Sequence, residues 1–308
     1  MKAYFALFAG ALIFTIACSS TKTVTKVEDA ETPRSYASEK YLGPRKKLAI
    51  TKFENLTRFG QRRLGENIST VLSTELAKTE RFVLLERERV DQILDQVKLS
   101  QSGLTEGALE QIQLLDADFI ITGAVTHYAV STTGSSNVFT QSKTQKAEVA
   151  ADVRIINVRT GEIILSESGK GEAEKKFSKV LGMGESGGYD ESLEMDAFRA
   201  AVVKVTENII SSLDQRPWIC DVVKIDSAKL YIDAGKKSNL KSGDVMEIYQ
   251  KGELIKDLSG RILGYEETLL DEAIVIDFIG DDGAILSVAS EKNFQMPLIC
   301  NLANRENQ

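Results

Sequence analysis

The sequence is poor in the residues that most often build catalytic and metal sites. It contains one histidine, three cysteines and four prolines among 308 residues. A zinc site takes about four His, Cys or acidic ligands, and a catalytic triad needs a histidine between two positioned partners. The single histidine, His127, lies inside the strand-like stretch AVTHYAV, without a Ser, Cys or Asp at a spacing that suggests such a set. The sequence therefore favours a protein that is not an enzyme and that holds no metal or cofactor.

The sequence also lacks an excess of positive charge, with 38 Lys and Arg against 45 Asp and Glu and a net charge of −7. Nucleic-acid-binding proteins carry basic stripes or patches, so we expect no nucleic-acid partner. The content of 43% hydrophobic and 27% charged residues is typical of a folded protein. The length indicates two domains that follow an N-terminal tail.

Residues after position 18 contain no stretch of roughly 18 consecutive apolar residues, the length needed for a membrane-spanning helix. Residues 1–20 do hold a shorter apolar run of 14 residues, from Ala3 to Ile16, after Lys2 and before Ala17 and Cys18. This segment resembles a bacterial lipoprotein signal, although Thr15 stands where that motif usually has leucine. We expect residues 1–17 to be removed and Cys18 to be lipidated. The alternative is an ordinary cleaved signal in which Cys18 is incidental.

Serines follow Cys18 at positions 19 and 20, and no aspartate of the kind that retains lipoproteins at the inner membrane is present there. We therefore expect a periplasmic protein that is anchored to the outer membrane by its lipid. Residues 18–46 are rich in Ser, Thr, Lys and Glu and cannot bury enough apolar surface to fold. They are interpreted as a flexible tether.

Two cysteines remain after Cys18 is used, namely Cys220 and Cys300. An even pair in an oxidising compartment favours a disulfide. The alternative is two small buried thiols in adjacent strands.

The pattern over residues 47–215 predicts an α+β domain with a mixed sheet. Leu64, Ile68, Leu72 and Leu76 recur at helical spacing, and Ala147–Val158 alternates apolar and polar residues as a half-buried strand does. Expected strands are Lys47–Asn55, Phe82–Leu85, Phe119–Val130, Ala147–Val158 and Ile163–Glu174, and expected helices are Gln61–Lys78, a helix from Glu86, and Ser192–Leu213. The turn Arg159–Glu162 joins two of these strands in a hairpin, and residues 131–146 form a polar connection. The glycine-rich residues 182–188 favour a flexible loop over a phosphate site, since no Gly-Lys-Ser/Thr follows.

A candidate hairpin and partner surface is formed by apolar side chains of this region. Its members are Val149, Val153, Ile155, Phe177 and Tyr189.

Three segments of this domain carry a family resemblance: ERFVLLERERVDQILDQVKLSQSG, DFIITGAVTHYAV and above all VRIINVRTGEIILSESGKGEA. They resemble the curli assembly and transport component (CsgG) family of outer-membrane lipoproteins, over about residues 47–214. The resemblance implies an α+β domain, an N-terminal lipid anchor and, as in the curli secretion member, a ring of subunits that exports fibre subunits. In that member two hairpins of each subunit enter a shared transmembrane barrel.

The corresponding segments of this chain, Thr126–Ala150 and Ser166–Asp190, have a weak apolar alternation. The second one places Lys170, Glu172 and Glu174 on one face, where contact with lipid would cost a few kcal/mol for each charge. We therefore expect both segments to stay in the periplasm as a hairpin extension or mobile loop.

Residues 216–300 change to short strands separated by Gly and Asp turns, which predicts a small C-terminal β-barrel. The segment LYIDAGKKSNLKSGDVMEIYQKGELIKDLSGRILG is similar to the C-terminal domain of the flagellar H-ring protein (FlgT) family. Expected strands are 222–225, 229–232, 245–250, 261–266, 269–278 and 283–287, followed by a polar tail at 301–308.

Two functions fit this sequence. The first is a non-catalytic, homo-oligomeric scaffold or secretion component of the curli type, with secreted fibre subunits or envelope proteins as partners. The second is a periplasmic adaptor lipoprotein without a pore, which binds cell-wall synthesis or flagellar-ring machinery.

Overall fold

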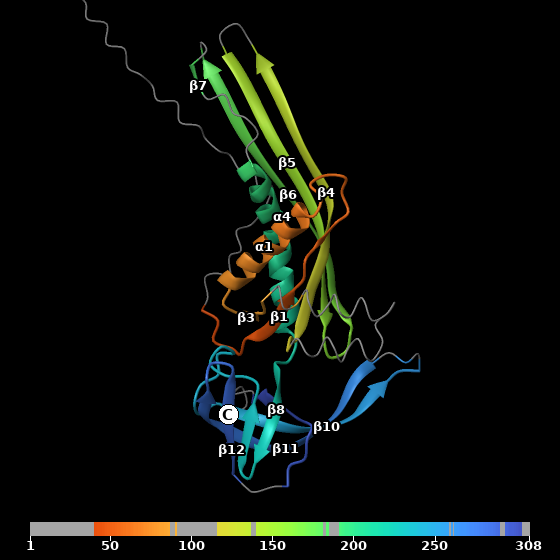
Figure 1. Ribbon diagram of the computed structural model, residues 1–308, viewed down its shortest axis with the longest axis vertical. Coiled ribbons are helices and arrows are strands. Elements are labelled where there is room, and N and C mark those ends of the chain that lie inside the picture. The colour runs from red at the N-terminus through yellow and green to blue at the C-terminus, as the bar shows by residue number, and fades with distance from the viewer. Residues whose placement is uncertain are drawn as a thin grey trace, which may run out of the picture.

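The computed structural model describes residues 40–86, 90, 116–136, 140–180, 183–184, 191–258, 260, 262–289 and 293–303. They form two domains that are joined end to end, with a long three-stranded extension at the far end of the first domain (Figure 1). The signal segment, Cys18, most of the expected helix after Glu86 and most of the glycine-rich residues 182–188 lie outside the described residues.

The N-terminal domain is built on a mixed sheet. Its strand order is β3-β1-β4-β5-β6-β7, and β2 pairs with β4. Strand β1 runs parallel to β3 and β4, while β4, β5, β6 and β7 pair in antiparallel fashion. The strands are β1 Lys46–Ile50, β2 Glu54–Asn55, β3 Phe82–Leu84, β4 Phe119–Ser136, β5 Thr140–Asn157, β6 Ile163–Val180 and β7 Met183–Gly184.

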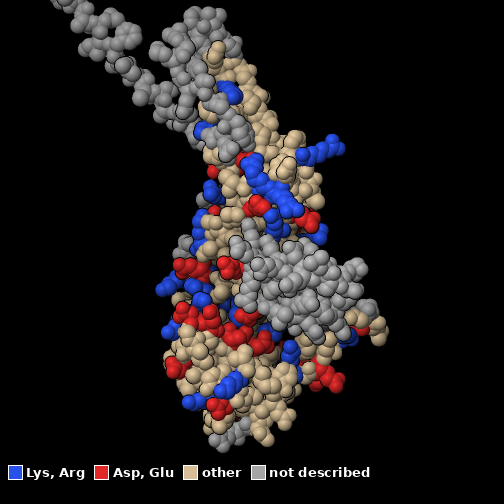
Figure 2. All heavy atoms as spheres, in the orientation of Figure 1, with Lys and Arg blue, Asp and Glu red and all other residues tan. Residues whose placement is uncertain are grey.

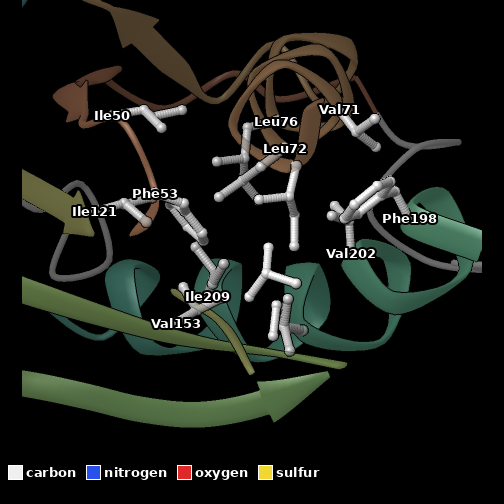
Figure 3. Close-up of a cluster of buried hydrophobic side chains, with 14 of the residues drawn as sticks. Ile50, Phe53, Val71, Leu72, Leu76, Ile121, Val153, Phe198, Val202 and Ile209 are labelled. Atoms are coloured by element: carbon white, nitrogen blue, oxygen red, sulfur yellow. The ribbon is translucent and has the colours of Figure 1, made fainter. Parts of the chain in front are cut away.

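Two helices, α1 (Arg63–Lys78) and α4 (Glu191–Asp214), cover one face of this sheet. Two of the three predicted helices, Gln61–Lys78 and Ser192–Leu213, are found with bounds within two residues of those expected. Their apolar stripes meet the sheet in one core, which includes Leu72, Val153 and Phe198 (Figure 3). Helix α4 contacts the sheet so closely that a Cβ added to Gly171 of β6 would lie 2.1 Å from the carbonyl oxygen of Ala197. Helix α4 can therefore pack this closely on β6 only because residue 171 has no side chain.

The extension consists of β4, β5 and β6, each of 18 residues. At about 3.3 Å per residue a strand of this length spans about 60 Å, and the three strands continue beyond the helices (Figure 1). The expected polar connection over residues 131–146 is wrong, because Ser131 to Ser136 pair with Lys146 to Gln141 as a regular ladder. These residues are polar because this end of the hairpin packs against no hydrophobic core. Their backbone N–H and C=O groups are still hydrogen-bonded through strand pairing.

The C-terminal strands close a barrel in the order β10-β11-β12-β9-β8-β13. They are β8 Ile219–Asp226, β9 Lys229–Ile232, β10 Val245–Lys256, β11 Ile262–Ile279, β12 Gly283–Val288 and β13 Leu298–Leu302. The two strands expected at 261–266 and 269–278 are one continuous strand, β11. Residues 301 and 302 of the expected tail at 301–308 belong instead to β13, which pairs with β10, and residues 304–308 lie outside the described residues.

Candidate functional site

The structure places most of the expected partner surface inside the domain. The side chains of Val149, Val153, Ile155 and Phe177 are between 0% and 6% exposed, and the first three pack in the core with the helices. The expectation that these residues form a partner surface is therefore wrong for Val149, Val153 and Ile155, because their strand turns that face toward the helices. Phe177 is also buried rather than exposed to a partner. Tyr189 lies outside the described residues.

The opposite face of the extension is charged and self-paired. The ammonium of Lys146 lies 2.7 Å from a carboxylate oxygen of Glu148 and 2.8 Å from one of Glu172. Hydrogen bonds to these two carboxylates raise the pKa of Lys146. His127 is 58% exposed on the same face, and its Nε2 lies 3.9 Å from Glu148. This face therefore carries partly exposed ion pairs, and among the described residues His127 has no triad-like setting.

The outer edges of the extension lack strand partners among the described residues. Strand β4 pairs with β1 and β2 only as far as Val125, so residues 126–136 bond to β5 on one side alone. At the other edge, β6 pairs with β7 only through Lys179 and Val180. Unpaired edges of this length are templates for pairing with another chain.

A buried carboxylate fixes the base of the extension to the helices. Glu194 of α4 is 1% exposed and accepts hydrogen bonds from Arg63 and Asn67 of α1, each at 3.0 Å. The hydroxyl of Tyr128, on β4, donates to the same carboxylate at 2.7 Å. Removal of the carboxylate would leave three donors from two elements without this acceptor.

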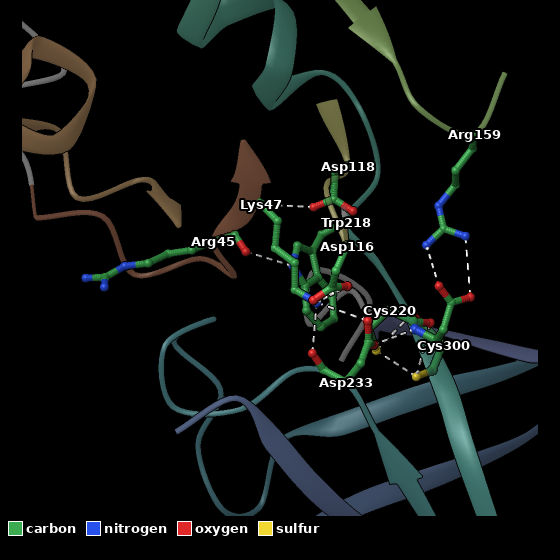
Figure 4. A network of polar contacts seen from close by, with 10 residues as sticks. Arg45, Lys47, Asp116, Asp118, Arg159, Trp218, Cys220, Asp233 and Cys300 are labelled. Carbon is green, nitrogen blue, oxygen red and sulfur yellow. Dashed lines mark hydrogen bonds and ion pairs between the residues drawn. The ribbon is translucent and has the colours of Figure 1, made fainter. Parts of the chain in front are cut away.

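The two domains meet at a second polar network, which is centred on Lys47 of β1 (Figure 4). The Lys47 ammonium lies 2.7 Å from Asp116 and 3.0 Å from Asp233, and it also donates to the carbonyl oxygen of Asp233 at 2.9 Å. Burial lowers the pKa of this lysine, but the charge of Asp233 and the contacts with Asp116 outweigh that effect, so its pKa is raised. Lys47 is therefore charged and joins the N-terminal sheet to the barrel.

Asp118 and Arg159 extend the network. Asp118 accepts a hydrogen bond from the backbone N–H of Lys47 at 2.7 Å, and burial raises the pKa of this carboxyl to about 6. The guanidinium of Arg159 lies 3.2 Å from Asp221 of β8. Asp221 in turn donates its backbone N–H to Asp233 at 2.8 Å.

The chain just before β1 also binds the barrel. Arg45 donates its N–H to Ser238 and accepts a bond from the Trp218 indole, both at 3.0 Å. The Asn239 amide donates to the carbonyl of Gly43 at 2.9 Å. Within the tether expected at residues 18–46, residues 42–46 are therefore bound to the folded body, and residues 18–39 lie outside the described residues.

A cleft of about 90 Å³ lies between the domains and is lined by the residues of this network together with Lys251. Burial lowers the pKa of Lys251, whose ammonium lies 3.9 Å from the Tyr265 ring centre. Within the part of the chain that the structure describes, no three His, Cys, Asp or Glu side chains converge as metal ligands. The positive and negative side chains of the network pair with one another. Acidic side chains are also concentrated at this height of the molecule (Figure 2).

The two cysteines of the barrel lie together. Cys220 of β8 is directly opposite Cys300 of β13, and both are buried free thiols with their sulfur atoms 2.8 Å apart. The sequence placed them in one domain, and the structure places them in adjacent strands. The disulfide itself stays a prediction.

The chain is similar to several known proteins. A lipoprotein of Neisseria meningitidis serogroup B is 28% identical over 200 residues, which are 62% of this chain and 86% of the relative. Among solved structures, lipoprotein GNA1162 from N. meningitidis (15% identity, 54% of this chain and 98% of that chain) has a TM-score of 0.31. The PelC dodecamer from Paraburkholderia phytofirmans (16% identity, 58% and 96%) has a TM-score of 0.32. The family model for the curli production assembly/transport component CsgG matches residues 30–274, most of the sequence, so the chain belongs to the CsgG family.

Proposed function

We propose that this protein is a lipid-anchored, non-catalytic assembly component of the bacterial envelope, which joins copies of itself through the open edges of the β4–β6 extension. Membership of the CsgG family and the related Neisseria lipoprotein support the class. The signal-like residues before Cys18 support an anchor at the outer membrane, with the body in the periplasm. Among the described helices, none is both long and apolar enough to cross a membrane.

The observation that carries the proposal is the pair of edges, at opposite sides of one extension, that have no strand partner among the described residues. The two edges belong to different strands, β4 and β6, which both run antiparallel to β5. The β6 edge of one copy would therefore meet the unlike β4 edge of the next copy. Contacts between unlike surfaces are head-to-tail, and they produce a ring when the rotation between copies closes. This geometry favours a cyclic oligomer that serves as a scaffold or secretion component for fibre subunits.

The alternative is a periplasmic adaptor without a pore, which binds cell-wall synthesis or flagellar-ring machinery. One observation favours it: the exposed face of the extension carries ion pairs such as Lys146 with Glu172. Lysine on a lipid-facing strand costs about 2–4 kcal/mol at the bilayer midplane. In this alternative the extension stays in water and its edges recruit another protein.

The experiment measures the mass of the full-length lipidated protein in mild detergent by light scattering after size exclusion. We expect an oligomer of discrete mass. Two matched variants, Ser131→Pro and Thr132→Pro, lie on the open part of β4. Successive residues of a strand point their N–H groups to opposite sides, so one proline removes a donor toward β5 and the other removes a donor at the free edge.

The variant that keeps the wild-type melting temperature is the one altered at the free edge, and we expect it to be monomeric. A wild-type protein of monomeric mass would support the adaptor and exclude the oligomer. Retention of the oligomer in the well-folded proline variant would show that β4 is not the interface. Mass spectrometry of the processed N-terminus tests lipidation of Cys18 separately.

A further inference from the structure

A pair of cysteines lies at the seam of the C-terminal barrel. The seam joins β8 and β13, the first and last strands of the domain, through three residue pairs. The central pair is Cys220 with Cys300, and their sulfur atoms are 2.8 Å apart (Figure 4). The two side chains are 3% and 0% exposed.

The backbone geometry of this pair suits a disulfide. A disulfide needs Cα atoms about 4.4–6.8 Å apart, and residues directly opposite in antiparallel strands have Cα atoms about 4.5–5.5 Å apart. A disulfide bond is about 2.05 Å long, so the sulfur atoms would have to approach by less than about 1 Å. We propose that Cys220 and Cys300 form a disulfide in the exported protein and that this bond closes the barrel.

The chemistry is a two-electron thiol–disulfide exchange. A thiolate of the pair attacks a disulfide oxidant, either a small-molecule disulfide or a dithiol oxidase, and the second cysteine then displaces the mixed disulfide. One Sγ–Sγ bond forms, the bond of the oxidant breaks, and the oxidant leaves as two thiols that carry the two electrons and protons. Burial raises the pKa of the Cys220 thiol, so the exchange belongs to the folding chain, before the barrel closes.

A metal site is the competing use of two adjacent cysteines. Asp221 and Asp233 are near the pair, but the described residues provide no converging set of three ligands. The sulfur atoms instead face each other, and each approaches the other residue's backbone carbonyl, at 3.5 Å and 3.7 Å. The disulfide is therefore the reaction that this arrangement favours.

The bond would support the domain junction. Asp221 follows Cys220 directly and binds Arg159 of the N-terminal domain. Its N–H donates to Asp233, which pairs with Lys47. A cross-link at Cys220 thus holds the strand that carries these contacts, and it closes a loop of about 80 residues in the unfolded chain.

The first test uses the full-length protein isolated from the envelope of cells that export it. The protein is denatured with a maleimide and without reductant, then digested and analysed by mass spectrometry. We expect a cross-linked pair of peptides that contain Cys220 and Cys300, and maleimide labelling of both only when reductant is added in denaturant. Labelling of both cysteines without reductant would overturn the proposal.

A second test does not depend on export or oligomerisation, so its outcome is separate from that of the proposed function. Reduced full-length protein is refolded with oxidised glutathione, and the barrel is followed by the fluorescence of Trp218, the single tryptophan. We expect the oxidised protein to melt on the order of 10 °C above the reduced protein. The Cys220→Ser/Cys300→Ser variant should melt at one temperature under both conditions. Failure of the wild type to form the bond, or equal melting of its two forms, would contradict the inference.

Discussion

Replacement of Gly171 by alanine tests the direct contact between α4 and β6. The added Cβ would lie 2.1 Å from the carbonyl oxygen of Ala197 and 2.4 Å from the backbone nitrogen of Ala201. Both are backbone atoms of a helix, so they cannot rotate away as a flexible side chain would. Overpacking of a filled core costs about 1–3 kcal/mol, and two contacts this short place the expected loss of stability near 3 kcal/mol.

The assay is urea unfolding followed by far-UV circular dichroism, because both described helices lie in the N-terminal domain. With a denaturant slope of about 2 kcal/mol per molar urea, a loss of about 3 kcal/mol lowers the midpoint by about 1.5 M. The fluorescence of Trp218, which packs in the barrel core, reports the other domain and should change much less.

Gly134→Ala is the matched control, since it is another glycine in a strand of the same sheet. Its added Cβ meets nothing nearer than the carbonyl oxygen of Ser142 at 3.6 Å. We expect this variant to be unchanged or stabilised by up to about 1 kcal/mol, because alanine loses less backbone entropy on folding than glycine. Equal midpoints for Gly171→Ala, Gly134→Ala and the wild type would refute the close packing of helix on strand.

Three further variants test the polar networks. Burial raises the pKa of Asp118 to about 6, above about 3.9 for unfolded aspartate. The contribution of Asp118 to the free energy of unfolding is therefore most favourable below pH 4 and is lost as the pH rises through 6, a change of at most about 3 kcal/mol. In Asp118→Asn this pH dependence should disappear from urea midpoints measured between pH 4 and 7. Lys47→Met leaves two carboxylates of the junction unpaired and should cost about 3 kcal/mol by Trp fluorescence, whereas Lys237→Met, at an exposed ion pair, should change nothing measurable. Glu194→Ala removes a buried acceptor and should cost about 3–5 kcal/mol by circular dichroism, while Asp196→Ala, at a more exposed pair, should cost less than about 1 kcal/mol.

The core elements could be predicted because their burial is one-sided. The stripe from Leu64 to Leu76 defines α1, and the alternation from Ala147 to Ile155 defines the inner part of β5. The upper part of the extension could not be predicted in this way, because residues 131–135 are exposed on both faces of the strand and show no alternation. Backbone pairing between β4 and β5 holds these residues in strands, and such pairing produces no hydrophobic pattern in the sequence.

The same alternation led to a wrong functional assignment. Val149, Val153 and Ile155 share a face because that face packs under α4 and α1, so the pattern that identifies the strand also identifies buried side chains. The surface that remains exposed at a strand edge consists of backbone groups, which leave no signature in the amino-acid sequence.

The domain junction was also invisible to local patterns. Lys47 and Asp233 are separated by 186 residues, and Arg159 and Asp221 by 62. Only Asp116 and Asp118 are close together in the sequence, and two aspartates at this spacing can equally mark the end of a helix before a strand. Their roles follow from the docking of two folded domains, which no window of sequence contains.

Strand β4 connects the two parts of the molecule that matter most for the proposed function. It begins at Phe119, directly after Asp118 of the junction, and it ends at Ser136 near the tip of the extension. Tyr128, between these points, is held by Glu194 of α4. The orientation of the open edge relative to the barrel is therefore set at both the junction and the helix layer. Because a closed ring requires a fixed rotation from each copy to the next, these buried polar contacts would restrict the geometry of the proposed assembly although they lie outside the proposed interface.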